Sequence, residues 1–272
     1  MDSFSKSVAA TLPLLRRIRD QLGSSPMASA AALDRVAASA RDSRSVSRRM
    51  VTPDAPAPAP VAPVSDPDAT WTWEALEQAV TTCTKCPHLV VSRKHVVFGV
   101  GRRDADLVFV GEAPGADEDA EGEPFVGKAG ELLSKILSAM NLTRDDVFIA
   151  NVLKCRPDMP PGTSGNRKPR ADEMATCLPW LIEQIHLIQP RVIVALGATA
   201  VQGLLDESRP IGALRGNWLD YRNIPVMPTY HPAYLLRNQS NSEKRKVWED
   251  MLAVMERLEM PISEKQRRFF SA

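Results

Sequence analysis

Four cysteines are the clearest candidates for chemistry in this sequence: Cys83, Cys86, Cys155 and Cys177. The first two form a C-x-x-C pair, a spacing that lets two thiolates bind one metal ion or one edge of a cluster. Structural disulfides are unusual in a cytosolic chain, so a shared metal site is favoured over four unrelated buried thiols. Zinc and a [4Fe–4S] cluster both accept four cysteines, and the spacing does not decide between them. A thioredoxin-like redox role is disfavoured, because CTKC precedes no strand–helix unit of the expected kind.

Two further polar residues, Asn151 and His231, lie where predicted strands end. A carboxamide both donates and accepts hydrogen bonds, so Asn151 can distinguish the edges of polar ligands. Because Pro232 can begin a helix, His231 should precede a helix N-terminus, where it can donate to a developing negative charge. The alternative for each is structural: Asn151 can make a turn contact, and His231 can be a satisfied core residue.

The elements that must position these residues alternate along the chain. Apolar runs predict strands, and amphipathic periodicity predicts helices. The alternation predicts an α/β fold, a three-layer α/β/α sandwich with a central, mainly parallel four-stranded sheet. The predicted strands are 107–111, 147–152, 191–196 and 224–228, and the predicted helices are 73–82, 127–140, 171–188, 198–205 and 241–258.

Sites in such folds lie at the carboxyl ends of the strands. The polar segments GEAPG, Asn151, LGA and TYHP each follow one predicted strand. We therefore expect all four at the same edge of the sheet.

Composition limits the remaining classes of function. The 272 residues are 44% hydrophobic and 25% charged, typical of a globular protein, and carry a net charge of only +1. A nucleic-acid partner must then be bound by local basic patches. With no apolar run near ~18 residues and no visible signal peptide, we expect a cytoplasmic protein with no membrane contact.

Composition also divides the chain into four parts. Residues 1–22 can form a short helix or docking segment, and 23–70 read as a disordered Ser/Ala/Pro-rich linker. Residues 71–260 form the globular domain, and 261–272 a flexible tail.

Several motifs together resemble the iron–sulfur, or family four, uracil-DNA glycosylases of the uracil-DNA glycosylase superfamily. They include CTKCPHL (83–89), GEAPGADEDAEGEPFVGKAGELL (111–133), NVLKCRPD (151–158), VALGATA (194–200) and TYHPAYLLRN (229–238). The resemblance covers nearly all of 72–258 and none of 1–70. It implies a [4Fe–4S] cluster on the four cysteines. It also implies base excision repair: uracil is flipped out of single- or double-stranded DNA and its N-glycosidic bond is hydrolysed, leaving an abasic site.

The resemblance also implies roles for individual residues. Phe125 would stack on uracil, and Asn151 would pair with uracil but not with cytosine, whose donor and acceptor pattern is opposite. His231 would stabilise the charge that develops on uracil. The implied sets are catalytic Glu112, Glu118 and His231; base-binding Gly111, Ala113, Phe125 and Asn151; and DNA-binding Leu235, Leu236 and Arg237. Glu118 is the favoured water-positioning carboxylate, Asp119 is a further candidate, and one of the two leucines should belong to the core.

Two departures from the family pattern matter. The segment DMPPGTSG between Cys155 and Cys177 is longer than expected, and no His-bearing insertion of the covalent-trapping subgroup is present, which favours turnover. A non-catalytic uracil- or single-stranded-DNA-binding module with a metal-stapled fold is the main alternative. A polymerase accessory protein is a weaker one. We expect a monomer that can contact a repair or replication protein through its N-terminal tail.

Overall fold

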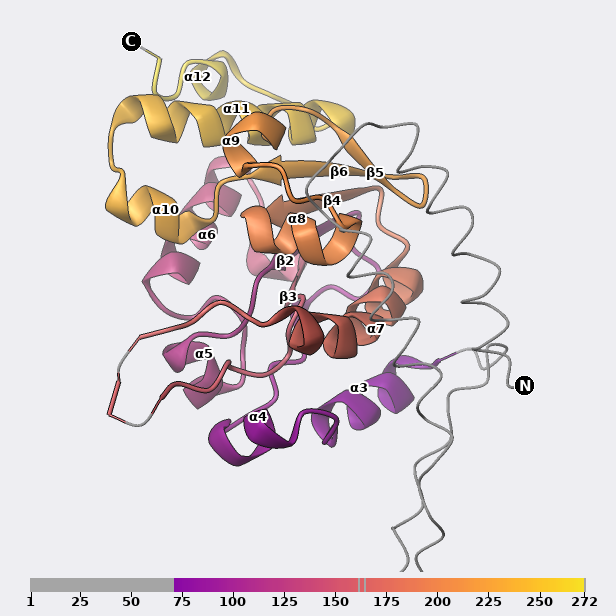
Figure 1. The fold of residues 1–272 in the computed structure, drawn as a ribbon. Helices are drawn as coiled ribbons and strands as arrows, with labels where there is room; N and C mark the ends of the chain where they lie inside the picture. Colours follow the sequence, from indigo (N-terminus) through magenta and orange to yellow (C-terminus); the bar gives the residue numbers. More distant parts are fainter. Residues whose placement is uncertain (1–70, 161, 164, 272) are drawn as a thin grey trace, which may run out of the picture. The chain divides into compact units, whose positions relative to one another are not determined.

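The computed structural model describes residues 71–160, 162, 163 and 165–271, and their centre is a six-stranded mixed sheet (Figure 1). The strand order is β1-β3-β2-β4-β6-β5. The strands are β1 (Val100–Gly101), β2 (Leu107–Gly111), β3 (Phe148–Asn151), β4 (Val192–Leu196), β5 (Leu219–Tyr221) and β6 (Ile224–Thr229). Predictions that fall on residues 1–70 lie outside the described residues.

The four predicted strands are β2, β3, β4 and β6, and they pair in parallel at the centre of the sheet. The prediction of a four-stranded sheet is wrong, because β1 and β5 add an antiparallel strand at each edge. With two and three residues, these strands are too short to show a periodic pattern. The β5–β6 turn uses Arg222 and Asn223 at φ 52° and 70°, positions where glycine is the usual sequence signal.

The helices confirm the five predicted segments to within one residue and add short ones. Helices of four to six residues carry too few apolar positions for the helical period to appear. In chain order the helices are α3 (Trp73–Thr81), α4 (Pro87–Ser92), α5 (Ala116–Glu121), α6 (Lys128–Ala139), the 3₁₀ turn η1 (Arg144–Asp146), α7 (Ala171–Ile188), α8 (Ala198–Leu205), α9 (Ile211–Leu214), α10 (Pro232–Arg237), α11 (Asn241–Arg257) and α12 (Glu264–Arg267).

Both faces of the sheet are buried, so β2 and β4 are apolar at every position. Successive side chains of a strand point to opposite faces. Phe109 accordingly belongs to the core formed with α6 and α11, whereas Val108 and Val110 belong to the core formed with α7 and α8. The sheet thus lies between helices on its two faces (Figure 1).

The C-terminal segment differs from the predicted flexible tail. Over residues 261–271 the chain forms α12 and packs on the domain. Trp248 donates its indole N–H to the Gln266 carbonyl at 2.6 Å, and the Gln266 amide donates to the Ala139 carbonyl at 2.8 Å. These contacts reach distant helices, so the local sequence pattern could not indicate them. None of the helices in the described part of the chain is long and apolar enough to cross a membrane.

Candidate functional site

The carboxyl ends of the central strands meet around a hollow of about 240 Å³. Five of the predicted site residues line it: Ala113, Glu118, Phe125, Asn151 and His231. The other lining residues are Gly115, Ala116, Asp117, Gly127, Lys128, Ala129, Asn166 and Ala233. The expectation that the polar strand ends gather at one edge is therefore confirmed for the β2, β3 and β6 segments.

Gly111 and Asn151 are direct partners in the β2–β3 register. A Cβ at Gly111 would lie 2.2 Å from Asn151 Oδ1 and 2.7 Å from Phe125 Cζ, so only glycine leaves room for both side chains. Asn151 is 3% exposed, and no described residue makes a hydrogen bond to its carboxamide. The donor and acceptor groups of the Asn151 carboxamide are therefore free of described residues and available to a ligand.

His231 is the N-cap of α10, and its Nδ1 accepts the backbone N–H of Ala233 at 3.1 Å. Burial, with a smaller contribution from the Arg237 charge, lowers the pKa of His231 to about 4. The imidazole is therefore neutral at pH 7. Since Nδ1 is an acceptor, Nε2 carries the proton and is the available donor.

Two neighbours fix the His231 ring. It stacks on Phe125, with ring centroids 5.5 Å apart and an angle of 28° between the planes. Gly197, the glycine of the LGA segment, has a φ of 94°, and a Cβ there would lie 3.2 Å from the His231 Cβ. The LGA segment therefore supports the histidine, although it does not line the hollow.

The predicted carboxylates occupy different environments. Glu118 lines the hollow, and its Oε2 accepts the Gly115 N–H at 3.0 Å, so part of its function is to hold the start of α5. Glu112 is not among the lining residues. Asp119 is buried and accepts the Lys94 N–H at 2.9 Å, which makes it a structural anchor.

Sequence reasoning missed Asp117, a second carboxylate in the hollow. A Cβ at Gly127 would lie 2.4 Å from Asp117 Oδ2, so glycine at the start of α6 lets this carboxylate approach. Asp117 could have been found if the short helix α5 had been recognised, because its first turn places residues 116–118 together. Asn166 and Lys128 were likewise not singled out from the sequence.

The two predicted wedge leucines separate by burial. Leu235 is 5% exposed and Leu236 is 37% exposed, so Leu235 is the expected core leucine. Both line a neighbouring hollow between α6, α10 and α11 rather than the one that holds His231. Arg237 follows at the exposed end of α10.

The four cysteines come together beside α3, α4 and α7. Cys155 and Cys177 are buried in one apolar cluster, and Cys83 and Cys86 pack against it. Burial raises the pKa of Cys177 to about 12, and burial together with the charges of Cys155 and Cys83 raises the pKa of Cys86. The four cysteines thus lie in one region of the described chain.

Nitrogen donors surround the sulfur atoms. Arg93 Nη1 donates to Cys155 Sγ at 3.0 Å, and the same guanidinium donates to the Cys83 carbonyl at 2.7 Å. The backbone N–H of Lys154 donates to Cys177 Sγ at 3.2 Å. Among the described residues, no three cysteine sulfurs lie within 4.8 Å of one another.

A group with metal-ligand character, His88, Asp158 and Glu173, has a different explanation. Arg167 donates to both carboxylates, and His88 Nε2 lies 2.8 Å from Glu173 Oε1. Burial opposes ionisation of Glu173, but the hydrogen bonds from Arg167, Arg170 and His88 lower its pKa to about 2. These residues form an ion-pair network that ties the segment after Cys155 to α7.

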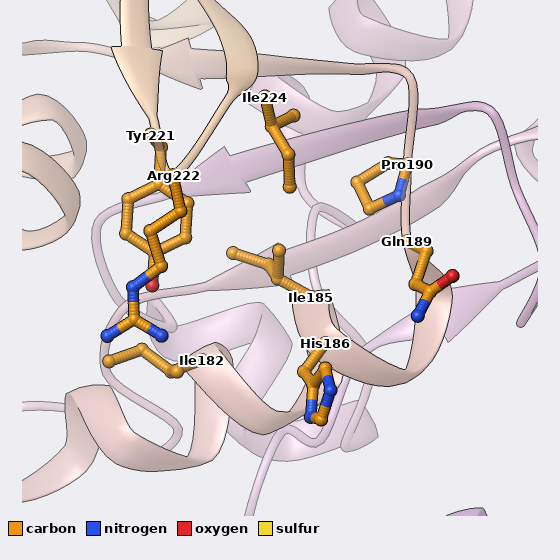
Figure 2. Close-up of a pocket in the computed structure, with 8 residues that line it drawn as sticks. All are labelled: Ile182, Ile185, His186, Gln189, Pro190, Tyr221, Arg222 and Ile224. Atoms are coloured by element: carbon orange, nitrogen blue, oxygen red, sulfur yellow. The ribbon is translucent and has the colours of Figure 1, made fainter.

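A second hollow, of about 320 Å³, lies where α7 ends and β6 begins (Figure 2). Apolar side chains, including Ile182, Ile185 and Ile224, line it together with Tyr221, Arg222 and His186. None of the predicted site residues reaches it, because it lies near the opposite ends of the parallel strands.

The sequence model of the uracil DNA glycosylase superfamily matches residues 98–252. A type-4 uracil-DNA glycosylase of Thermotoga maritima is 47% identical over 180 residues, which cover 65% of this chain and 90% of that protein. A type-4 uracil-DNA glycosylase of Archaeoglobus fulgidus is 39% identical over 62% of this chain and 88% of its own length. A type-5 uracil-DNA glycosylase of Pyrobaculum aerophilum is 28% identical over 57% and 80%.

Proposed function

The chain belongs to the uracil DNA glycosylase superfamily, and we propose that it removes uracil from DNA by hydrolysing the N-glycosidic bond. The observation that carries this proposal is one hollow in which a carboxamide without a partner among the described residues, a neutral histidine donor and an aromatic ring meet. A flipped base needs all three, for pairing, charge stabilisation and stacking.

The specificity follows from Asn151. Its carboxamide donates to uracil O4 and accepts from N3–H. Cytosine presents the reverse pattern, so it would leave two groups unpaired at about 1–3 kcal/mol each. β3 holds Asn151 at its end, and Gly111 leaves the space that the carboxamide occupies.

The chemistry follows from His231. As the glycosidic bond breaks, negative charge develops on uracil, and the Nε2–H of a neutral imidazole donates to it. The sugar becomes cationic, so a carboxylate that orients water opposite the departing base lowers the barrier. Glu118 and Asp117 are the carboxylates that line the hollow, and we assign the water to this pair.

We propose that the four cysteines hold a [4Fe–4S] cluster. The gathering of the four cysteines in one described region and the N–H donors to Cys155 and Cys177 support it. The buried Trp180 Nε1, one helical turn after Cys177, has no partner among the described residues, and a cluster sulfur would accept from it. When bound, the cluster would cross-link three chain segments, those of Cys83 and Cys86, of Cys155 and of Cys177, and it would supply no electron to this hydrolysis.

For DNA contact we propose Leu236 and Arg237, the exposed pair on α10, as an apolar wedge with a flanking cation. Leu235 supports the wedge from the core. The monomeric state, the cytoplasmic location and a repair partner for the N-terminal tail remain predictions from the sequence.

The test compares two histidine variants on uracil-containing oligonucleotides. His231→Ala should slow uracil release at least ~100-fold, the range for losing one preorganised donor. His186→Ala is the matched control, because His186 is exposed near the hollow of Figure 2, away from His231. Equal activity of the two variants would reject the site. Iron content and a visible absorption band of anaerobically purified protein test the cluster, and zinc in place of iron would reject it.

A further inference from the structure

Phe125 has an unusual backbone. Its φ is 56°, in the left-handed region that residues with a Cβ rarely adopt. The ring is 5% exposed and stacks on His231. The position of the Phe125 ring therefore depends on a backbone conformation that is unfavourable by itself. Other contacts must stabilise this turn.

Arg144 of η1 supplies such a contact from 19 residues away. Its Nη1 donates to the Phe125 carbonyl at 3.1 Å, and its Nη2 donates to the Pro124 carbonyl at 2.6 Å. The guanidinium is partly buried, and burial lowers the pKa of Arg144 although the group remains charged. The planar guanidinium binds the carbonyl groups of two successive residues, so it fixes the orientation of the backbone at Phe125.

Gly130 of α6 packs against the other side of the same turn. A Cβ at Gly130 would lie 1.7 Å from the Phe125 carbonyl oxygen. The carbonyl therefore lies between the Arg144 fork and a helix that approaches closely only because it has glycine there.

The edge strand β1 anchors Arg144 in turn. A Cβ at Gly101 would lie 1.9 Å from the Val147 carbonyl oxygen and 2.9 Å from that of Arg144. The Arg102 N–H also donates to the Val147 carbonyl at 2.9 Å. Because β1 and η1 pack backbone to backbone, the sheet holds the backbone of Arg144 in place.

We propose that Arg144 is a positioning residue for the base pocket: by clamping the turn at Pro124 and Phe125, it places the stacking ring and, through that ring, His231. Arg144 is not among the residues that line the hollow, so it acts on the base only through Phe125. This inference rests on the proposed glycosylase function.

The experiment compares Arg144→Met and Arg144→Lys with Arg102→Met, an exposed arginine nearby whose side chain bonds to Asp104. Arg144→Met should slow single-turnover uracil release roughly 10–100-fold, the scale for displaced catalytic groups. Arg144→Lys should recover little, because an ammonium cannot span two carbonyls. Arg102→Met should match wild type, and affinity for uracil-free DNA should be unchanged in all three variants.

The decisive comparison is a double-mutant cycle with Phe125→Ala. If Arg144 acts through Phe125, adding Arg144→Met to Phe125→Ala should slow release by less than ~3-fold more. Fully multiplicative losses, or Arg144→Met with wild-type kinetics, would overturn the proposal. An inactive wild type would instead reject the glycosylase function.

A second readout needs no activity. In an NMR titration, Arg144→Met should move the pKa of His231 upwards from about 4 towards the ordinary value of 6.5, since a loosened Phe125 lets water reach the imidazole. An unchanged His231 titration in a folded Arg144→Met protein would also overturn the proposal.

Discussion

The base pocket and the four-cysteine region are positioned by different means. In the pocket, glycines and backbone contacts hold each functional side chain: Gly111 accommodates Asn151, and Ala233 orients His231. In the cysteine region, thiols with raised pKa values lie beside a buried indole N–H that no described residue accepts. The protein alone preorganises the pocket, whereas the cysteine region is completed by the proposed cluster.

The two regions are joined by one short segment. Cys155 lies four residues after Asn151, and between them the Val152 and Leu153 N–H groups donate to the Gly111 and Glu112 carbonyls at 3.0 and 3.1 Å. The GEAPG segment therefore holds this stretch independently of the cysteines. Substitutions in the four-cysteine region should therefore displace Asn151 only slightly.

Asn151→Ala should show the largest difference between the two regions, because it should impair the base pocket and leave the four-cysteine region unchanged. Loss of the base-pairing carboxamide should lower the rate of uracil release at least ~100-fold. The melting temperature and the visible absorption band should not change, because no described residue bonds to this side chain. A variant that loses the visible band along with activity would show that the two regions are not separable.

The converse change is Cys155→Ala. It removes one proposed cluster ligand and the acceptor of the half-buried Arg93 Nη1, and an unpaired donor costs up to about 1–3 kcal/mol. We expect the visible band to disappear and the melting temperature to fall by roughly 5–10 °C. Single-turnover release by the folded fraction should fall less than in Asn151→Ala. A Cys155→Ala protein as stable and active as wild type would contradict the cluster's structural role.

The two neighbouring leucines of α10, Leu235 and Leu236, should respond differently to substitution by alanine. Leu235→Ala removes a core side chain and should lower the free energy of unfolding by about 2–5 kcal/mol. Leu236→Ala removes an exposed one and should leave stability nearly unchanged. If Leu236 is the wedge, its loss should slow release from double-stranded DNA about 10-fold and from single-stranded DNA much less. If release from double-stranded and single-stranded DNA slowed equally, Leu236 would not be the wedge.

The smallest expected effect is on pH dependence. The pKa of His231 is about 4 in the folded protein and 6.5 when unperturbed, so the unfolded chain binds more protons between these values. Stability from this residue is complete above pH 6.5 and declines as the pH falls towards 4. Allowing for solvent in the hollow, the loss between pH 7 and 5 should be about 1–2 kcal/mol. Denaturant titrations of wild type and His231→Gln at both pH values measure it, and equal pH dependence would refute the shift.

The sequence predicts the position of the base pocket better than it predicts the contacts that hold the pocket side chains in place. Apolar strands ending in Asn151 and preceding His231 are local patterns, and parallel topology brings strand ends together. Arg144 was missed because it acts through a left-handed Phe125 and two distant glycines, Gly101 and Gly130, and tertiary contacts set all of these. Strand β1 was missed for the same reason, although it anchors Arg144.

The most direct test of the central claim is multiple-turnover release of free base with substrate in excess over the anaerobically purified protein. Oligonucleotides that differ only in carrying uracil or cytosine at one position should be compared. Our account predicts several equivalents of free uracil, abasic sites in matching amount, and no detectable cytosine. A persistent protein–DNA complex without free uracil would contradict it and indicate a binding module instead.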